Sequence, residues 1–434
     1  MKNEATPQLT PDRIMHLAHR TQHLRSNIIR DMLKVATQTD MISLGGGNPA
    51  KESFPVNEMA RLTTTVMHRY NATALQYSDT QGFLPLREAL STWLSGQGIP
   101  ASPENIIITS GSQSALDILA KTLINDGSPV IGEQPTYLGA LQAFSLFAPR
   151  WRFVLEDKDG PVPKSLERLL RPENSDGESP MLYMMPTFGN PTGQSWSARR
   201  TTQIAAILQQ TGNWVIEDDP YRLLRYDSTP PPPLKSLLPD QTVYLGTLSK
   251  VFAPGLRLGY CLAPDALMPW LIKTKQGTDL NTGTLAQALA AEYLESGRLD
   301  DNLPGVVAIY KTKRDALAAA LRKYLPADFT FRLPCGGMFL WVKGPPEFDS
   351  EQFLSFAIKH GVFIVPGSAF FDTGVAPLDI REHLRCMRLN FSGPELEKLP
   401  LAAQRLSKAL ADYWRHKINA CLDVPVSLRK NTAP

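Results

Sequence analysis

IIITSGSQSALDILAKTLI, residues 106–124, contains the succession of secondary structure from which the fold class is predicted. Its first part, residues 106–109, is a short apolar run, and a turn of small residues follows at once. From Ala115 to Leu123 the apolar side chains then recur at the three- and four-residue spacing of an amphipathic helix. The stretch therefore predicts a buried strand, a tight turn and a helix in direct succession.

The same alternation continues toward the middle of the chain. Apolar runs that predict further strands occupy residues 129–132, 181–185, 214–218 and 243–246. Helical segments separate most of them, and one is SARRTTQIAAILQQ at 197–210. Strands that alternate with helices are typical of a mainly parallel sheet sandwiched by helices. We therefore predict an α/β fold, in which ligands bind at the carboxyl ends of the strands.

The character of the sequence changes after about residue 300. A long helical segment, VVAIYKTKRDALAAALRKYL, leads into short apolar runs and a final helix, LAAQRLSKALADYW, which together predict a smaller α+β domain. A chain of 434 residues is also longer than one core usually organises. We predict an N-terminal arm and helix (1–45), a large cofactor-binding domain (46–300), a small C-terminal α+β domain (301–418) and a flexible tail (419–434).

Composition and charge exclude several classes of protein. The hydrophobic content of 43%, the charged content of 20% and the net charge of +3 give no reason to propose nucleic acid or a membrane as a partner. The polar N-terminus lacks the apolar segment of a secretion signal, and Cys261, Cys335, Cys386 and Cys421 lie far apart, which predicts free thiols in a cytoplasmic protein. The seven histidines show no paired metal-ligand spacing, so no metal site is predicted.

Lys250 stands among apolar residues and glycines in TLSKVFAPGLRLGY, residues 247–260. Most lysines on loops are simply solvated, but these small apolar neighbours would suit such a lysine poorly. Burial lowers the pKa of a lysine and leaves its neutral amine available to form a Schiff base. Arg257, in the same stretch, would lower that pKa further and could bind an anion.

A phosphate site is indicated close to this lysine. Ser112 and Gln113 lie in SGSQ, at a predicted strand-to-helix turn, where free backbone N–H groups and the helix dipole favour an anion. An ordinary helix N-cap would explain Ser112 equally well. Two hydroxyls and a guanidinium would come from Thr247, Ser249 and Arg257.

Three further motifs would suit a planar heteroaromatic ring. WVIEDDPY places three acids at a strand end, of which one could hold a ring nitrogen protonated and at least one would be only a solvated turn residue. Asn190 in FGNPTG could donate to a ring oxygen or serve the turn alone, and Tyr137 in EQPTY could stack on the ring or be a core aromatic. A Schiff-base lysine, a phosphate cradle, an acid for a ring nitrogen and a stacking aromatic together indicate pyridoxal 5'-phosphate as the cofactor.

The order of these motifs resembles that of the fold type I, class I/II aminotransferases, over roughly residues 25–415. The set is ISLGGGNP, LQYSDTQGFLPLREAL, TSGSQSALD, EQPTY, GNPTG, IEDDPY, TLSK with PGLRLGY, GGMFLWV, VPGSAF and MRLNFS. The kynurenine/2-aminoadipate aminotransferase branch is the most similar, and LGGGNPA and CMRLNF are also similar to valine–pyruvate aminotransferases. The resemblance implies a homodimer that moves an amino group between an L-amino acid and a 2-oxo acid by a ping-pong mechanism.

The resemblance also implies roles for residues of the cofactor site. Lys250 would form the Schiff base and act as general base, Asp218 would pair with the pyridine nitrogen, and Tyr137 would stack on the ring. Asn190 and Tyr221 would bind the ring hydroxyl, and Tyr221 would assist catalysis there. The phosphate would be held by Ser112, Gln113, Thr247, Ser249, Arg257 and, from the neighbouring subunit, Tyr77.

For the substrate, the resemblance implies that Arg388 in MRLNFS binds the α-carboxylate as a bidentate fork. The backbone of Gly47 and the side chain of Asn190 would lie close to that carboxylate. Arg30 in RSNIIRDML would either meet a distal carboxylate or be a solvated helix residue. Aromatic, branched-chain and 2-aminoadipate-like donors all remain open.

Two other functions fit parts of the sequence. The same fold hosts pyridoxal-phosphate-dependent lyases, cyclases and decarboxylases, and a cofactor site alone does not choose among them. Similar domains also occur in transcription regulators, where a winged-helix domain precedes them. Only about forty residues precede LGGG here, fewer than a DNA-binding domain needs, so we expect an enzyme.

Overall fold

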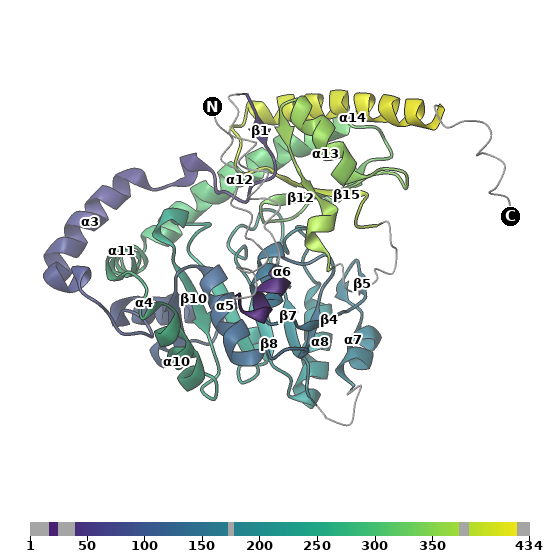
Figure 1. The fold of residues 1–434 in the computed structure, drawn as a ribbon. Coiled ribbons are helices and arrows are strands. Elements are labelled where there is room, and N and C mark those ends of the chain that lie inside the picture. Colours follow the sequence, from purple (N-terminus) through teal and green to yellow (C-terminus); the bar gives the residue numbers. More distant parts are fainter. Residues whose placement is uncertain (1–16, 25–39, 172–177, 373–381, 423–434) are drawn as a thin grey trace.

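The computed structural model describes residues 17–24, 40–171, 178–372 and 382–422. Figure 1 shows two bodies of secondary structure, the lower one built on a seven-stranded sheet and the upper one on a four-stranded sheet. Helix α12 (Arg298–Tyr324) runs from one body to the other.

The seven-stranded sheet is the mainly parallel sheet that the sequence predicts. In spatial order its strands are β2 (Ile106–Thr109), β10 (Gly259–Leu262), β9 (Thr242–Thr247), β8 (Val215–Asp218), β7 (Met181–Met184), β3 (Pro129–Gly132) and β4 (Arg150–Phe153). Strand β10 is antiparallel to both of its neighbours, and the other neighbouring pairs are parallel. The α/β fold class is therefore confirmed.

Helices cover both faces of this sheet because its strands bury side chains in two directions. Along β7, Met181 and Tyr183 belong to the larger hydrophobic core, whereas Leu182 and Met184 belong to a second, smaller one. The larger core includes residues of α5 (Ser112–Leu123), α6 (Leu138–Ser145), α10 (Met268–Asp279) and α11 (Thr284–Glu295). The smaller core includes residues of α7 (Pro163–Leu170), α8 (Ala198–Thr211) and α9 (Leu234–Leu237).

The upper body is the smaller α+β part. Its antiparallel sheet has the order β11 (Thr330–Phe331), β12 (Phe339–Lys343), β15 (Cys386–Asn390) and β14 (Val365–Pro366). Helices α13 (Ser350–Lys359) and α14 (Lys398–Leu422) pack beside it. The early strand β1 (Ile42–Ser43) joins this body by pairing in parallel with β13 (Val362–Phe363).

The remaining elements are short, apart from two helices near the N-terminal side of the large body. These two are α3 (Val56–Tyr70) and α4 (Leu84–Gly96). The short ones are η1 (His19–His23), η2 (Lys51–Ser53), η3 (Asn71–Leu75), η4 (Pro103–Asn105), β5 (Glu156–Asp157), β6 (Gly160–Pro161), η5 (Pro254–Leu256) and η6 (Gly367–Phe370).

Two long helices extend further than the sequence analysis expected. Helix α12 begins at Arg298, directly after Gly297 with its left-handed φ of 71°, so the expected domain boundary at residue 300 falls inside a continuous helix. Asp300 and Asp301 lie in its first turn, where acidic side chains stabilise the helix dipole. Helix α14 continues to Leu422, so residues 419–422, expected to belong to the tail, are helical.

The structure also bears on membrane spans, metal sites and disulfides. Within the described ranges, no helix combines the length and apolarity of a membrane span. No group of three or more His, Cys, Asp or Glu side chains in the same ranges is arranged to hold a metal ion. The cysteines at positions 261, 335 and 386 are free thiols.

Candidate active site

The predicted site residues follow strands that all end at one edge of the large sheet. Strands β9, β8, β7 and β3 are parallel to one another, and β2 has their direction because the antiparallel β10 lies between β2 and β9. Gly259, the first residue of β10, pairs with the last residues of β2 and β9, Thr109 and Thr247. Turns after five strands and before a sixth therefore meet at this edge.

Two adjoining cavities occupy this edge. The first, which we call the cofactor pocket, is lined by Gly47, Asn48, Pro49, Ser112, Gln113, Tyr137, Met185, Asp218, Pro220, Tyr221, Thr247, Ser249, Lys250, Pro254 and Arg257. The second, which we call the substrate cleft, is lined by Gly46, Gly47, Asn48, Gln113, Asp117, Tyr137, Leu138, Gly139, Gln142, Ala143, Asn190, Tyr221, Lys250, Phe339 and Arg388. Lys250, Tyr137 and Tyr221 line both cavities, so the two form one site.

One end of the cofactor pocket is an anion cradle at the start of α5. Gly111 precedes this helix with a φ of 85°, and no side chain caps the first N–H groups. Arg257 also has a left-handed backbone (φ 53°), rare for a residue with a side chain, and its Nη2 donates to the carbonyl of Ser110 at 3.3 Å. Uncapped amides, a helix N-terminus and a guanidinium at one place favour a phosphate group.

Gly259 makes this cradle possible through the lack of a side chain. A Cβ at this position would lie 2.7 Å from the backbone C of Gly111 and 2.7 Å from the N of Ser112. We expect Gly259→Ala to push the start of α5 away and raise the dissociation constant of a bound phosphate-bearing cofactor by at least about tenfold, since several charge-assisted hydrogen bonds would be weakened together. Titration of the cofactor-free protein, followed by absorbance, measures this constant. Gly255→Ala is the control, because its Cβ would meet nothing within 4 Å; equal constants for both variants would contradict the prediction.

The turn after β9 brings hydroxyls to the same pocket. The Thr247 hydroxyl donates to the carbonyl of Leu258 at 3.0 Å and accepts from the backbone N–H of Ser249 at 3.1 Å. The Ser249 hydroxyl lies 3.0 Å from that of Thr247. Both side chains are buried, so their orientation is fixed before any ligand binds.

Lys250 follows this turn and points into the site. Its Nζ donates to the carbonyl of Gly47 at 3.0 Å. Burial, together with the positive charges of Arg257 and Arg388, lowers the pKa of Lys250 to about 8. A neutral amine, able to attack a carbonyl carbon or accept a proton, is therefore accessible near neutral pH.

Of the three acids at the end of β8, only Asp218 lines the cofactor pocket. Its Oδ2 accepts a hydrogen bond from the Tyr183 hydroxyl at 2.6 Å, whereas its buried Oδ1 has no partner among the described residues. Burial raises the pKa of Asp218 to about 7. Glu217 accepts instead from the backbone N–H groups of residues 234 and 235, and Asp219 pairs with Arg222, so these two acids stabilise the fold.

Tyr137, Tyr221 and Asn190 surround the middle of the site. Burial raises the pKa of Tyr137 to about 12 and that of Tyr221 further still, so both hydroxyls stay protonated. The ring of Tyr221 packs edge-on against Phe339, with 5.8 Å between the ring centroids. Asn190 is buried and accepts a hydrogen bond from Arg388.

Arg388 comes from β15 of the small body and reaches the large one. Its Nη1 donates to Oδ1 of Asn190 at 2.9 Å, its Nη2 donates to the carbonyl of Gly45 at 2.6 Å, and its Nε has no partner among the described residues. The guanidinium lies 4.3 Å from the ring centroid of Phe339 and 4.9 Å from that of Phe370. Burial lowers the pKa of Arg388 to about 10, and the group carries no carboxylate partner within the described part of the chain.

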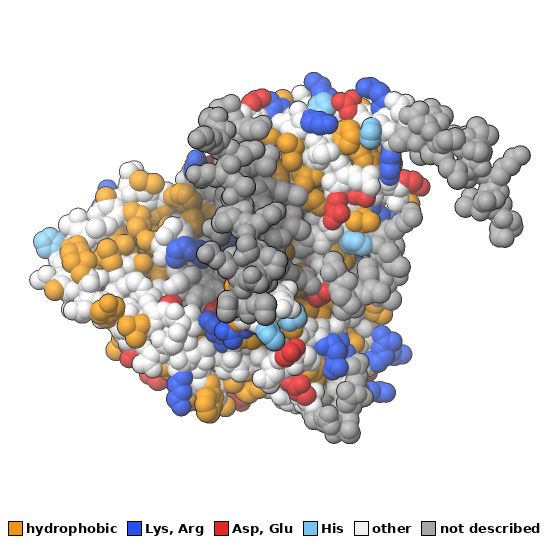
Figure 2. Space-filling view, in the orientation of Figure 1, with side chains coloured by type: hydrophobic (Ala, Val, Ile, Leu, Met, Phe, Trp, Pro, Cys, Tyr) orange, Lys and Arg blue, Asp and Glu red, His pale blue; other side chains and the backbone are white. Residues whose placement is uncertain are grey.

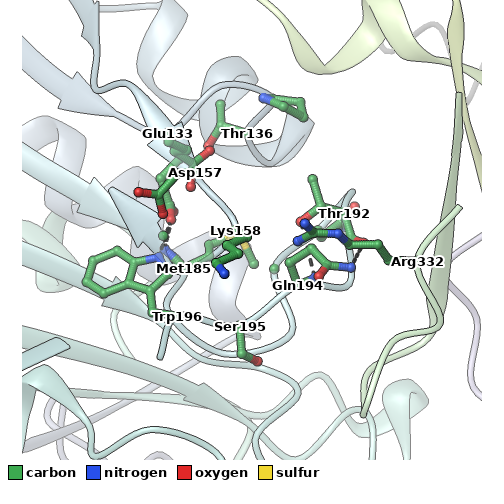
Figure 3. Close-up of a pocket in the computed structure, with 15 residues that line it drawn as sticks. Glu133, Thr136, Asp157, Lys158, Met185, Thr192, Gln194, Ser195, Trp196 and Arg332 are labelled. Carbon is green, nitrogen blue, oxygen red and sulfur yellow. Dashed lines mark hydrogen bonds between the residues drawn. The ribbon is translucent and has the colours of Figure 1, made fainter. Parts of the chain in front are cut away.

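A third pocket adjoins the site and is shown in Figure 3. The buried carboxylate of Glu133 accepts from the backbone N–H of Met185 at 2.6 Å and from the indole N–H of Trp196 at 2.7 Å. Both ends of the loop that carries Asn190 are thereby bonded to Glu133, the residue that follows β3. Burial raises the pKa of Glu133, and these two donors lower it. We infer that Glu133, in the wall of this pocket, supports the loop that carries Asn190.

One predicted residue among those the structure describes is not brought to the site within one chain. Tyr77 is 77% exposed and lines neither the cofactor pocket nor the substrate cleft. Arg30 lies outside the described residues. Sequence patterns did not identify Tyr183, which lies inside an apolar strand run. They also did not identify Phe339, Asp117 and Gln142 of the cleft, because these residues carry no local signal of chemistry.

Comparison with known proteins agrees with this geometry. Residues 39–406 match the family described as aminotransferase class I and II. The chain is 37% identical, over 406 residues, to aromatic-amino-acid aminotransferase 1 of Thermococcus litoralis, covering 93% of this chain and 96% of that one. It is 34% identical to 2-aminoadipate transaminase of Thermus thermophilus, covering 89% and 94% of the two chains.

A solved structure is also similar over nearly the whole chain. The kynurenine aminotransferase of Pyrococcus horikoshii, solved in complex with PMP, has a TM-score of 0.86 and 36% identity, and the match covers 93% of this chain and 98% of that one. The chain therefore belongs to the class I and II aminotransferase family, and the protein is an aminotransferase of fold type I.

Proposed function

We propose that this aminotransferase takes the amino group from an L-amino acid with a neutral aromatic or aliphatic side chain and transfers it to a 2-oxo acid, with Lys250 as the general base. One observation carries the proposal. The amine of Lys250, the guanidinium of Arg388 and the unpartnered Oδ1 of Asp218 converge on two cavities that share their lining.

The cofactor is pyridoxal 5'-phosphate, and the described residues fit it. A buried carboxylate oxygen without a partner, Oδ1 of Asp218, suits a protonated ring nitrogen. The uncapped start of α5 beside Arg257 suits the phosphate. When bound, this cofactor supplies an aldehyde that condenses with amines and a ring that withdraws electrons from the substrate.

The residues that would hold the cofactor line the cofactor pocket, except Asn190, which lines the adjoining substrate cleft. Ser112, Gln113, Thr247, Ser249 and Arg257 would bind the phosphate, and Tyr137 would stack on the ring. Asn190 and Tyr221 would bind the ring hydroxyl. Lys250 would provide the covalent attachment, because its amine is the one Nζ that opens into both cavities among the described residues that line them.

For the substrate, Arg388 would hold the α-carboxylate and the Gly47 backbone would lie beside it. The unpartnered Nε of Arg388 and the location of Arg388 on the wall of the cleft support this role. A carboxylate held there would orient the Cα–H bond toward Lys250, whose Nζ would take up the proton. Burial of Lys250 keeps enough of the amine neutral for that task.

The charges of the cleft support a neutral substrate side chain. Among the described residues that line it, Arg388 and Lys250 are the cations, and both are committed to the reacting end of the substrate. Asp117 adds a carboxylate at the cleft and pairs with Lys121 at 2.6 Å. Among the described residues that line the cleft, a second carboxylate on the substrate would therefore face no further cation and the carboxylate of Asp117, whereas Leu138, Ala143 and Phe339 offer apolar contacts.

The same lining supports a ping-pong order of binding. Donor and acceptor both carry an α-carboxylate, and the described part of the cleft has one arginine to bind it. The two substrates would then occupy the same place in turn, so the first product leaves before the second substrate enters.

A homodimer is the assembly that we propose. Exposed apolar side chains concentrate between residues 56 and 84, where Val56, Leu75, Tyr77 and Leu84 are 69%, 67%, 77% and 48% exposed. Figure 2 shows hydrophobic side chains gathered over the lobe that contains α3. Patches of this kind mark protein interfaces, and pairing through this one would bring the partner's copy of Tyr77 toward the phosphate cradle.

A panel of amino acids tests the proposed function. We expect kcat/KM for phenylalanine or leucine to exceed that for 2-aminoadipate by about tenfold or more, because an unpaired buried carboxylate costs more than about 1.4 kcal/mol. Turnover should require an added 2-oxo acid and give parallel double-reciprocal lines. Asp117→Asn should reduce the difference in kcat/KM between leucine and 2-aminoadipate.

Two results would contradict the proposal. Release of product without a 2-oxo acid would indicate lyase or decarboxylase chemistry. A preference for 2-aminoadipate over phenylalanine and leucine would show that a cation outside the described lining binds the distal carboxylate, and Arg30→Ala would then remove that preference.

A further inference from the structure

The contact between Tyr183 and Asp218 has no role in the function described so far. Tyr183 lies on β7 and is fully buried, and its hydroxyl donates to Oδ2 of Asp218 at 2.6 Å. In the sheet register Tyr183 is opposite Ile216, two residues before Asp218 on the neighbouring strand. Residues two apart share a face, so Tyr183 meets Asp218 on a diagonal that an aromatic side chain can span.

The position of the Tyr183 ring is fixed by its surroundings. Phe144 packs edge-on against it, with 5.7 Å between ring centroids and an interplanar angle of 86°. Burial and the charge of Asp218 raise the pKa of Tyr183 well above its ordinary value, so the hydroxyl remains a donor at every physiological pH. Asp218 is therefore held at one oxygen by a permanent donor, and its other oxygen lines the cofactor pocket.

This donor acts against the rest of the environment of Asp218. Burial and the neighbouring charge of Asp219 raise the pKa of Asp218, the Tyr183 hydrogen bond lowers it, and the net result is a pKa of about 7. Among the residues that the structure describes, Tyr137 and Tyr221 also interact with Asp218, and both are neutral. Without the Tyr183 hydroxyl, the carboxyl would hold its proton at higher pH and could rotate away from the pocket.

We propose that Tyr183 is a positioning residue for Asp218: its hydroxyl anchors Oδ2 so that Oδ1 faces the place where the pyridine nitrogen of the cofactor would bind. The proposal rests on the proposed function, in which Asp218 pairs with that nitrogen. Tyr183 touches neither cofactor nor substrate in this arrangement, and its effect reaches the ring only through Asp218.

The test uses two ligands that differ at one atom. Cofactor-free wild type and Tyr183→Phe are titrated with pyridoxal phosphate and with the analogue in which the ring nitrogen is replaced by carbon. Tyr183→Phe keeps the ring that packs on Phe144 and removes only the hydroxyl. We expect the dissociation constant of pyridoxal phosphate to rise about tenfold, as for loss of a hydrogen bond to a charged group, and that of the analogue to stay within about twofold.

Tyr244→Phe is the matched control. Tyr244 is a buried tyrosine on β9, opposite Glu217, and its hydroxyl donates to Oδ2 of Asp219 at 3.2 Å. It therefore has the same diagonal geometry toward an acid that does not line the cofactor pocket. We expect its removal to leave the ratio of the two dissociation constants unchanged. Thermal unfolding of each cofactor-free variant is measured alongside, and Tyr183→Met repeats the test if the phenylalanine variant does not fold.

The possible outcomes separate the proposal from the function on which it rests. If Tyr183→Phe raised the dissociation constants of pyridoxal phosphate and of the analogue equally, the role of Tyr183 would be merely structural. If both constants stayed at their wild-type values, Tyr183 would have no role. Either result overturns this proposal and leaves the proposed function standing. A wild-type protein that binds both ligands equally, with Asp218→Asn unchanged from it, would overturn the assignment of Asp218 and the proposal with it. The proposal is supported if the wild type binds pyridoxal phosphate more tightly than the analogue, if Tyr183→Phe and Asp218→Asn each lose this difference in dissociation constants, and if the double variant loses no more.

Discussion

Replacement of Lys250 by alanine is expected to lower kcat by at least about a thousandfold, because one side chain supplies both the covalent attachment and the base. The described residues that line the substrate cleft include no other lysine and no histidine. Tyr137 and Tyr221 are nearby, but burial raises their pKa values and keeps their hydroxyls protonated. Neither could therefore replace the amine.

Two measurements separate the roles of Lys250. Borohydride reduction followed by peptide mapping should find a pyridoxyl group at position 250 in the wild type and none in Lys250→Ala, while single-turnover kinetics report the loss of the base. Lys158→Ala is the control, since Lys158 lines the third pocket and not the reacting cavities. Turnover by Lys250→Ala at more than about a tenth of the wild-type rate would refute the assignment of the base.

The pH dependence of cofactor attachment follows from the environment of the same residue. Burial and two neighbouring arginines lower the pKa of Lys250 to about 8. The amine attacks only when neutral, so attachment to cofactor-free protein should accelerate as pH rises through about 8 and level off above it. A surface lysine, with a pKa near 10.4, would still be accelerating at pH 9.5. A midpoint near 10 would show that the amine is solvated.

The sequence predicted the site better than it predicted the ends of the elements. Asp218 ends an apolar run, and Lys250, Asn190 and Tyr137 lie in short polar clusters that come after such runs. Parallel strands bring their carboxyl ends to one edge, so local patterns were enough to place these residues together. The ends of α12 and α14 were misplaced because helix propensity alone does not fix where a long amphipathic segment begins or ends.

Contacts between residues far apart in the sequence could not be predicted from local patterns. Tyr183 occurs in a run of apolar residues and reads as core, and only the register of β7 against β8 gives it a partner. Glu133 reads as a turn residue, yet it ties two parts of the loop after β7. The pairing of Arg388 with Asn190 joins positions 198 residues apart and depends on how the small body docks on the large one.

Arg388→Met is expected to lower kcat/KM for every α-amino acid by at least about a hundredfold. The guanidinium is buried between Phe339 and Phe370, and a carboxylate that entered the cleft without it would be left desolvated and unpaired, which costs about 3–5 kcal/mol. Arg388→Lys keeps the charge but loses the planar fork, so we expect it to recover only part of the activity.

The same substitution should not weaken the fold of the ligand-free protein. Burial lowers the pKa of Arg388 to about 10, which means that the folded protein disfavours the charged form that is present at neutral pH. Removing the charge relieves this cost and offsets the lost bonds to Asn190 and the carbonyl of Gly45. Thermal unfolding of cofactor-free Arg388→Met should therefore occur at or above the wild-type temperature, while activity collapses. As a control, a primary amine without a carboxylate should react at similar rates with wild type and Arg388→Met. If Arg388→Met still processed α-amino acids within about threefold of wild type, their carboxylate would bind elsewhere.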